Sequence, residues 1–89
     1  MYFTYILFSE SLDRYYIGAT EDPQERIKKH NSKNKGFTNR AKDWEFVYLN
    51  SFESKKEAFE HEKQIKSWKS RAKIKKLIED NPISEHPDA

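Results

Sequence analysis

Runs of β-branched and aromatic residues mark three segments of the chain. Two of them, at positions 2–8 and 14–19, are separated by a short polar stretch, which is typical of a β-hairpin. The third segment lies at positions 45–52, and its side chains should point alternately to the two sides of a strand. The alternation predicts that one side of this strand carries Phe46, Tyr48, Asn50 and Phe52 and the other carries Val47 and Leu49.

After the hairpin, Asp22 and Pro23 predict the start of a helix. An aspartate before the first turn accepts hydrogen bonds from free backbone amides, and proline already has the backbone angle of the first helical position. We expect this helix to cover residues 23–31. Ile27 is its only large apolar residue, so the helix should make a narrow contact with the rest of the protein and expose most of its surface.

Two further helices follow the third strand. Ser54 and Glu57 have the spacing of a capping box, in which each residue satisfies a free amide at the helix start, and they predict a helix over residues 55–69. Ser70 can cap a last helix that runs to Ile78 and ends before the proline at position 82. The expected order of elements is therefore β-β-α-β-α-α.

The remaining segments are polar. Residues 32–42 are basic and lack apolar periodicity, which predicts a loop of a length at which functional loops are common. Residues 81–89 contain two prolines and no apolar pattern, and we expect this C-terminal tail to be disordered. The 89 residues are thus predicted to form one domain over residues 1–80.

Composition excludes several classes of protein. The chain has no cysteine, which rules out a disulfide framework and a thiolate metal site and fits a reducing compartment. No apolar run approaches the roughly 20 residues that cross a bilayer, and the N-terminus does not have the pattern of a secretion signal. We therefore expect a soluble, cytoplasmic protein that does not associate with a membrane.

The basic residues are unevenly distributed. The net charge is +2, but all 17 lysines and arginines precede Glu79, whereas only 11 of the 15 acidic residues do, so the first 78 residues carry +6. A basic surface attracts phosphate polymers by Coulomb attraction and counterion release, although many basic domains bind none. The charge is compatible with nucleic-acid binding and does not establish it.

One glutamate interrupts the apolar face of the helix at 55–69. The apolar positions there are Ala58, Phe59, Ile65 and Trp68, and Glu62 falls among them. A carboxylate that packs on a sheet needs a basic partner, hydrogen-bond donors or a cation. A salt bridge is the simpler explanation, and a metal ligand is the more specific one.

Other candidate chemistry lies earlier in the chain. Arg26 and His30 are four residues apart and point the same way from their helix. Arginine offers a fork that matches phosphate, and histidine can transfer a proton near neutral pH, but solvated helix residues are the commoner explanation. Tyr15 and Tyr16 must point to opposite faces of the sheet, so one can pack in the core while the other lines a cleft.

The sequence contains no glycine-rich phosphate loop, no serine or cysteine nucleophile arrangement and no zinc-ligand spacing. The three histidines are too scattered to suggest a metal cluster. Of the chemical classes that the residues can test, phosphodiester chemistry with a single hard cation on Glu62 agrees best with them.

Four motifs occur in order: residues 4–7 with Tyr5, residues 16–18 with Tyr16 after ten intervening residues, residues 23–30 with Arg26 and His30, and residues 62–66 with Glu62. In order and spacing they resemble the GIY-YIG nuclease family, specifically its small single-domain bacterial members. The resemblance covers about residues 2–78. It implies an α/β (α+β) fold, a three-stranded antiparallel sheet flanked by helices, with the site on one face of the sheet.

Position by position, Tyr5 and Tyr16 match the two tyrosines of the family name, Arg26 the arginine of the next helix, His30 the residue one turn later and Glu62 the metal ligand. In members that cut DNA, a tyrosine or histidine helps to deprotonate water, the arginine holds the scissile phosphate and the glutamate binds one Mg²⁺ or Mn²⁺. The physics agrees, because a cation and a guanidinium both stabilise an anionic transition state.

The chain departs from the family pattern at two places. The glycine of the first motif is absent, since residues 3–5 are Phe-Thr-Tyr. Ala19 follows Gly18 where DNA-repair nicking members of the family resemble one another in carrying lysine. Without that positive charge to lower its pKa, Tyr16 would need activation from His30 or from the metal.

The resemblance implies a metal-dependent DNA endonuclease. Because we expect no second domain that reads sequence, selectivity for branched or flapped DNA and dependence on a protein partner are both open questions. A non-catalytic nucleic-acid-binding module and a scaffold domain are the alternatives. For contacts with backbone phosphates we expect the basic side chains of the loop and of the helix at 55–69, namely Lys33, Lys35, Arg40, Lys42, Lys55, Lys56, Lys66 and Lys69.

Overall fold

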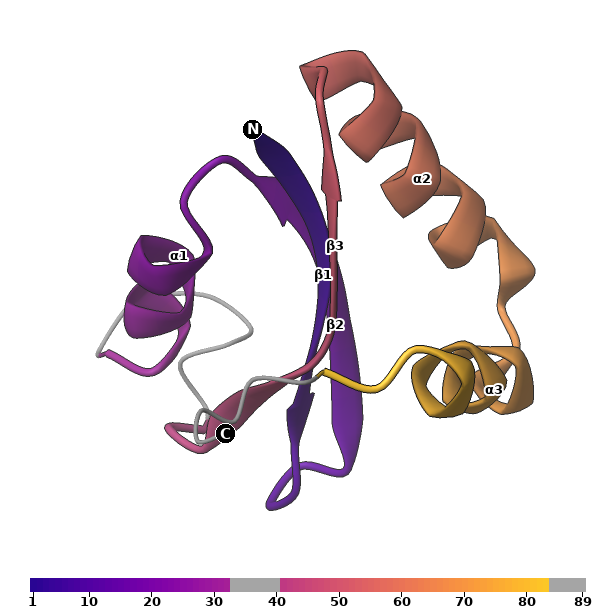
Figure 1. Ribbon diagram of the computed structural model, residues 1–89. Helices are drawn as coiled ribbons and strands as arrows, with labels where there is room; N and C mark the ends of the chain where they lie inside the picture. The colour runs from indigo at the N-terminus through magenta and orange to yellow at the C-terminus, as the bar shows by residue number, and fades with distance from the viewer. Residues whose placement is uncertain (33–40, 84–89) are drawn as a thin grey trace.

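A three-stranded antiparallel sheet separates the helices into two groups (Figure 1). The computed structural model describes residues 1–32 and 41–83. Their elements are β1 (Tyr2–Ser9), β2 (Arg14–Thr20), α1 (Pro23–His30), β3 (Trp44–Phe52), α2 (Lys55–Trp68) and α3 (Arg71–Asp80). The predicted order and the antiparallel sheet are confirmed, with α1 on one face of the sheet and α2 and α3 on the other.

The central strand is β1, and the strand order is β2-β1-β3, so β2 is an edge strand. Each face of the sheet has its own core. The core on the α1 side contains Tyr5, Leu7, Ala41 and Trp44, and the core on the α2 side contains Ile6, Tyr48 and Ile65. As predicted for neighbours on a strand, Tyr16 packs against the first core and Tyr15 against the second.

The predicted sidedness of β3 is wrong at one point. Ile6 pairs with Tyr48 but Leu7 pairs with Phe46, so Val47 lies between two paired residues without a partner of its own. An extra residue in one strand is a β-bulge, which breaks the alternation of side chains between the two faces. Phe46 therefore packs on the α1 side, whereas Val47 and Tyr48 both pack on the α2 side.

The predicted helix starts are confirmed by their capping bonds. The side chains of Asp22, Ser54 and Ser70 each accept a hydrogen bond from the backbone amide three residues later, at 3.1, 3.1 and 3.2 Å. A buried bond also fixes α2 on the sheet, because Thr4 Oγ1 donates to the carbonyl oxygen of Ala58 at 2.7 Å. Ala58 lies one helical turn before Glu62, so this bond fixes the depth at which that turn of α2 packs.

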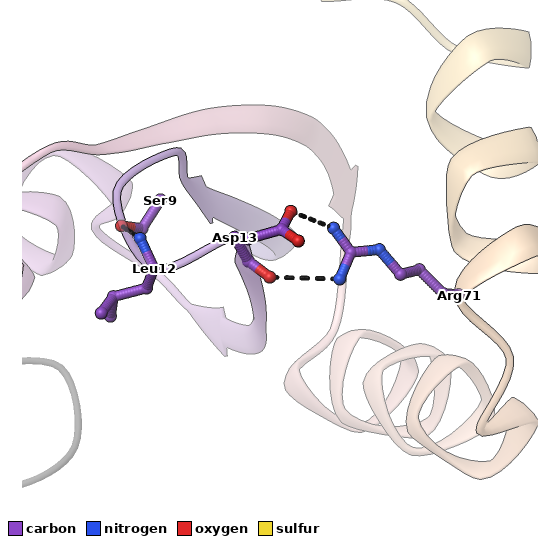
Figure 2. Close-up of polar contacts among 4 residues, drawn as sticks. All are labelled: Ser9, Leu12, Asp13 and Arg71. Carbon is purple, nitrogen blue, oxygen red and sulfur yellow. Dashed lines mark hydrogen bonds and ion pairs between the residues drawn. The ribbon is translucent and has the colours of Figure 1, made fainter.

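The turn between β1 and β2 is fastened to the start of α3. Figure 2 shows Arg71 of α3 donating to both the carbonyl oxygen and the carboxylate of Asp13, while the amide of Leu12 donates to Ser9 Oγ. Asp13 has a φ of 55°, in the left-handed region that turns often use. The Arg71 guanidinium also lies 5.1 Å from the centre of the Tyr15 ring. Together these contacts hold α3 against the hairpin.

Two predicted segments lie largely outside the residues that the structure describes. Residues 33–40 of the expected loop and 84–89 of the expected tail are not described. Before the tail, Asn81 Nδ2 donates to the carbonyl oxygen of Leu77 at 3.0 Å, and Ile83 lines an apolar hollow with Phe3 and Leu49. Within residues 1–32 and 41–83, no helix is long and apolar enough to span a bilayer.

Candidate active site

Helix α1 is short, and hydrogen bonds tie both of its ends. Asp22 caps the start, and Asn31 at the end makes two bonds with the backbone of Trp44, accepting from its amide at 2.8 Å and donating to its carbonyl at 3.1 Å. Trp44 begins β3, so α1 is held against the sheet at its C-terminal end. These bonds supplement the narrow apolar contact through Ile27 and fix the direction in which Arg26 and His30 project.

Three of the predicted site residues come together on the α1 side of the sheet. The ring centre of Tyr5 is 6.4 Å from that of Tyr16 and 6.4 Å from that of His30, and the Tyr16 and His30 centres are 4.5 Å apart. The rings of Trp44 and Phe46 surround this group, the first 6.4 Å from Tyr16 and the second 6.0 Å from Tyr5. One residue each from β1, β2 and α1 thus forms a cluster with rigid aromatic walls.

The hydroxyl of Tyr5 has an unusual position. Tyr5 is opposite Gly18 in the sheet and only 1% exposed, and its Oη has no hydrogen-bond partner among the described residues. A Cβ at Gly18 would lie 2.5 Å from this oxygen, so only glycine leaves room for it there. A buried hydroxyl without a partner costs stability, and such a group in a native protein calls for an explanation.

Burial raises the pKa of Tyr5 to about 12, and electrostatic interactions with Tyr16 and Glu62 act in the same direction. The guanidinium of Arg26 opposes them by its charge and, more weakly, as a hydrogen-bond donor, which places this cation near the hydroxyl, although the contact falls short of good hydrogen-bond geometry. At neutral pH the Tyr5 hydroxyl therefore keeps its proton and is available to donate a hydrogen bond.

His30 is buried as well, at 7% exposure, and its Nδ1 has no partner within the described part of the chain. Burial lowers the pKa of His30, and the positive charge of Arg26 lowers it further. The imidazole is therefore neutral at pH 7 and able to accept a proton.

Glu62 is partly buried on α2, with its side chain 18% exposed, and its Oε2 forms an ion pair with Lys66 Nζ at 2.7 Å. The simpler prediction for this carboxylate, a salt bridge, is confirmed. The Tyr5 hydroxyl lies over the backbone of Gly18 in the edge strand β2. The charge of Glu62, on α2, contributes to raising the pKa of Tyr5.

Side chains from the two faces meet at this edge. A hollow of about 230 Å³ is lined by Tyr2, Ala19, Thr20, Glu21, Arg26, Lys55 and Phe59. Arg26 comes from α1 and Phe59 from α2, with the end of β2 between them. The hollow therefore lies at the free edge of β2, between a side chain of α1 and side chains of α2.

The donor set suits a divalent cation that is shared with a substrate. Within residues 1–32 and 41–83, no group of three or more His, Cys, Asp or Glu residues could form a metal cage. Mg²⁺ usually keeps several waters and binds one or two carboxylates together with substrate phosphates. One carboxylate, Glu62, near the unpartnered Tyr5 hydroxyl fits this mode once Lys66 moves away.

The predicted phosphate-binding residues are only partly described. Lys33, Lys35 and Arg40 lie outside the described residues. Lys42 is exposed beside Ala41 of the α1-side core, Lys66 is paired with Glu62, and Lys69 ends α2 with a φ of 49°. The described members of this set thus lie on both sides of the sheet.

Phe59 lines this hollow, a position that the sequence pattern did not reveal. The apolar pattern of α2 predicted that it packs on the sheet with Ala58 and Ile65, and this prediction is wrong because Phe59 is 43% exposed. Successive helix residues are rotated by about 100°, so Phe59 cannot share the buried direction of Ala58. Its place directly after Ala58 was the signal that could have revealed this.

The α+β fold thus brings Tyr5, Tyr16 and His30 into one cluster on the α1 side of the sheet, and Arg26 of the same helix lines a hollow at the end of β2. A family model for the GIY-YIG catalytic domain matches residues 1–76, and the chain belongs to the GIY-YIG family. No curated protein and no solved structure is significantly similar to it. Membership in this family indicates a nuclease with a nucleic-acid substrate, and GIY-YIG nucleases in general depend on a metal.

Proposed function

We propose that the chain is a metal-dependent DNA endonuclease that hydrolyses a phosphodiester bond at the edge of β2. The observation that carries this proposal is the Tyr5 hydroxyl, which is buried without a partner over Gly18, beside the Arg26 cation. A polar group that costs stability in the free protein can gain its partner when substrate or water arrives. Such costs are concentrated at functional sites.

Each side chain then has a separate role. Arg26 binds the nonbridging oxygens of the scissile phosphate through its fork of donors. The neutral imidazole of His30 takes the proton from the attacking water, directly or through a tyrosine hydroxyl. The protonated hydroxyl of Tyr5 orients that water, because its raised pKa prevents it from acting as a phenolate base at neutral pH.

In the reaction, the water oxygen bonds to phosphorus and the ester bond to the leaving oxygen breaks. The products are a phosphate monoester and a hydroxyl, with the leaving oxygen protonated. Glu62 would hold one Mg²⁺ or Mn²⁺ after exchanging its contact with Lys66. When bound there, the ion would supply stabilisation of the negative charge that develops on the phosphate.

One observation favours a second function, a nucleic-acid-binding module without catalysis. Lys66 occupies the carboxylate of Glu62 at 2.7 Å, and a permanent ion pair there would exclude a metal. In that case the exposed residues Lys42, Lys55, Lys56 and Lys69 would contact backbone phosphates, and binding would weaken with salt but produce no cleavage.

The test is cleavage of labelled duplex, single-stranded, flapped and branched DNAs in Mg²⁺, Mn²⁺ or EDTA. We expect cleavage by the native protein in either metal and none in EDTA, and a loss of at least about 100-fold in rate for Glu62→Gln. Glu60→Gln is the matched control, because Glu60 lies on the same helix and is exposed.

Normal cleavage by Glu62→Gln would show that the metal ligand is assigned to the wrong residue. Salt-dependent binding by the native protein, with no cleavage of any substrate in either metal, would favour the binding module instead.

A further inference from the structure

An exposed aromatic ring lies one turn before the proposed metal ligand. Among the described residues, the large hydrophobic side chains that are exposed are Met1, Leu49 and Phe59. Of these three, Phe59 lines the same hollow as Arg26, and Glu62 follows it by three residues on α2. A large apolar face held in water beside a phosphate-binding arginine is a candidate contact surface.

The surroundings of Phe59 are suited to a nucleotide. Lys55 Nζ lies 5.5 Å from the centre of the Phe59 ring, and Arg26 lines the same hollow. Lysine has a flexible stem, so the same ammonium can pair with a phosphate when a base occupies the ring face. Glu21 is the acidic residue among those that line the hollow, and it is exposed.

The size of the hollow favours part of a polymer over a whole small molecule. At about 230 Å³ it is smaller than the roughly 300–1,000 Å³ of pockets that enclose drug-sized ligands. A single base with its flanking phosphates requires only a flat ring to stack on and cations beside it. Aromatic side chains between basic residues are the usual means of holding unpaired bases.

We propose that Phe59 is a stacking platform for one unpaired DNA base next to the phosphate that Arg26 holds. The identity of that phosphate as the scissile one rests on the proposed function. A base inside a duplex is stacked on both faces by its neighbours and cannot lie on the ring. The platform therefore selects DNA with an unpaired nucleotide beside the cleavage point, as in a flap or at a branch.

The test is a binding measurement in EDTA, where no cleavage interferes. A flapped DNA carries the fluorescent base 2-aminopurine at successive positions from the junction, and stacking on an aromatic ring quenches its emission. We expect quenching at one position with the native protein and none with Phe59→Ala. The variant should also bind the flapped DNA about 10-fold more weakly, within a range of roughly 5- to 150-fold, and bind a blunt duplex with unchanged affinity.

Two further variants separate stacking from general effects. Leu49→Ala removes another exposed apolar side chain, one that does not line this hollow. It should change neither the quenching of 2-aminopurine nor the affinity for flapped DNA. Phe59→Leu keeps an apolar side chain without a flat ring and should still lose the quenching. Because Phe59 is exposed, all Phe59 variants should melt like the native protein.

Unchanged quenching and affinity in Phe59→Ala, or an equal loss of affinity for the blunt duplex, would overturn the platform. The nuclease proposal can fail separately. If the native protein cleaves DNA and Phe59→Ala changes neither quenching nor affinity, the nuclease proposal stands and the stacking platform is wrong. If quenching depends on Phe59 but no metal supports cleavage, the stacking platform stands and the nuclease proposal is wrong.

Discussion

Each face of the sheet carries a tyrosine–histidine arrangement, and the two differ in hydrogen bonding. On the α2 side, Tyr48 Oη and His61 Nε2 are 2.8 Å apart, and Asn50 Nδ2 donates to the same Tyr48 oxygen at 3.3 Å. On the α1 side, Tyr5 Oη and His30 Nδ1 are both buried, and neither has a partner in the described part of the chain.

The comparison separates a structural use of these residues from a functional one. The bond between Tyr48 and His61 joins β3 to α2 and satisfies two partly buried polar groups, so it contributes to stability. The described residues supply no hydrogen-bond partner to Tyr5 Oη or His30 Nδ1, so these two groups do not gain the stabilisation that the bond between Tyr48 and His61 provides. Burial lowers the pKa of both histidines, so the difference between the faces lies in the partners and not in the protonation state of the imidazoles.

The largest expected effect comes from removing one hydroxyl on each face. Tyr5→Phe should lower the cleavage rate by about 100- to 10,000-fold, the range for groups that assist proton transfer, and leave the free energy of unfolding equal or higher. Tyr48→Phe should lower the free energy of unfolding by about 1 kcal/mol and leave cleavage within a few-fold of native. Cleavage kinetics and urea unfolding measure the two quantities.

If Tyr5→Phe and Tyr48→Phe changed the cleavage rate and the free energy of unfolding by similar amounts, the functional and structural roles assigned to the two faces would be wrong. Tyr15→Phe is a control for Tyr5→Phe. It also removes one tyrosine hydroxyl from the sheet, but Tyr15 packs on the α2 side, away from the α1-side core that contains Tyr5.

A smaller effect is expected when the space for the Tyr5 hydroxyl is filled. In Gly18→Ala the added Cβ would lie 2.5 Å from Tyr5 Oη and 2.7 Å from Tyr5 Cζ, so the ring must move against Phe46 and Tyr16. Overpacking of this kind costs about 1–3 kcal/mol, and the displaced hydroxyl should also slow cleavage. Urea unfolding and cleavage of the same substrate check both. A variant with native stability and native rate would show that the hydroxyl has room elsewhere.

The smallest expected effect concerns the pH dependence of stability. The pKa of His30 is lowered in the folded protein, so as pH falls through 6.5 the unfolded chain binds a proton that the folded protein excludes. This contribution to stability is complete above pH 6.5 and is lost as pH falls toward the folded pKa, with a slope of at most about 1.4 kcal/mol per pH unit.

His30→Gln should therefore lose less stability than the native protein between pH 7.5 and pH 5.5, as measured by urea unfolding at each pH. The dependence that remains belongs to His61 and the carboxylates. An identical pH dependence in both proteins would show that His30 does not titrate differently in the folded and unfolded states.

The sequence by itself determined the elements and their order. The caps at Asp22, Ser54 and Ser70 were predictable because each bond joins residues only three positions apart, and the strands were predictable from runs of β-branched and aromatic residues. The candidate site residues were indicated by four short motifs, which hold their spacing along the chain and do not depend on packing.

The tertiary structure alone decided which of these residues meet and in what state. The bulge at Val47, the exposure of Phe59 and the position of Tyr5 over Gly18 all depend on packing between elements that are distant in sequence. A local pattern reports the preferences of neighbouring residues and carries no information on strand register or on which helix face remains uncovered. The unpartnered hydroxyl of Tyr5, on which the proposed function rests, is a product of that packing.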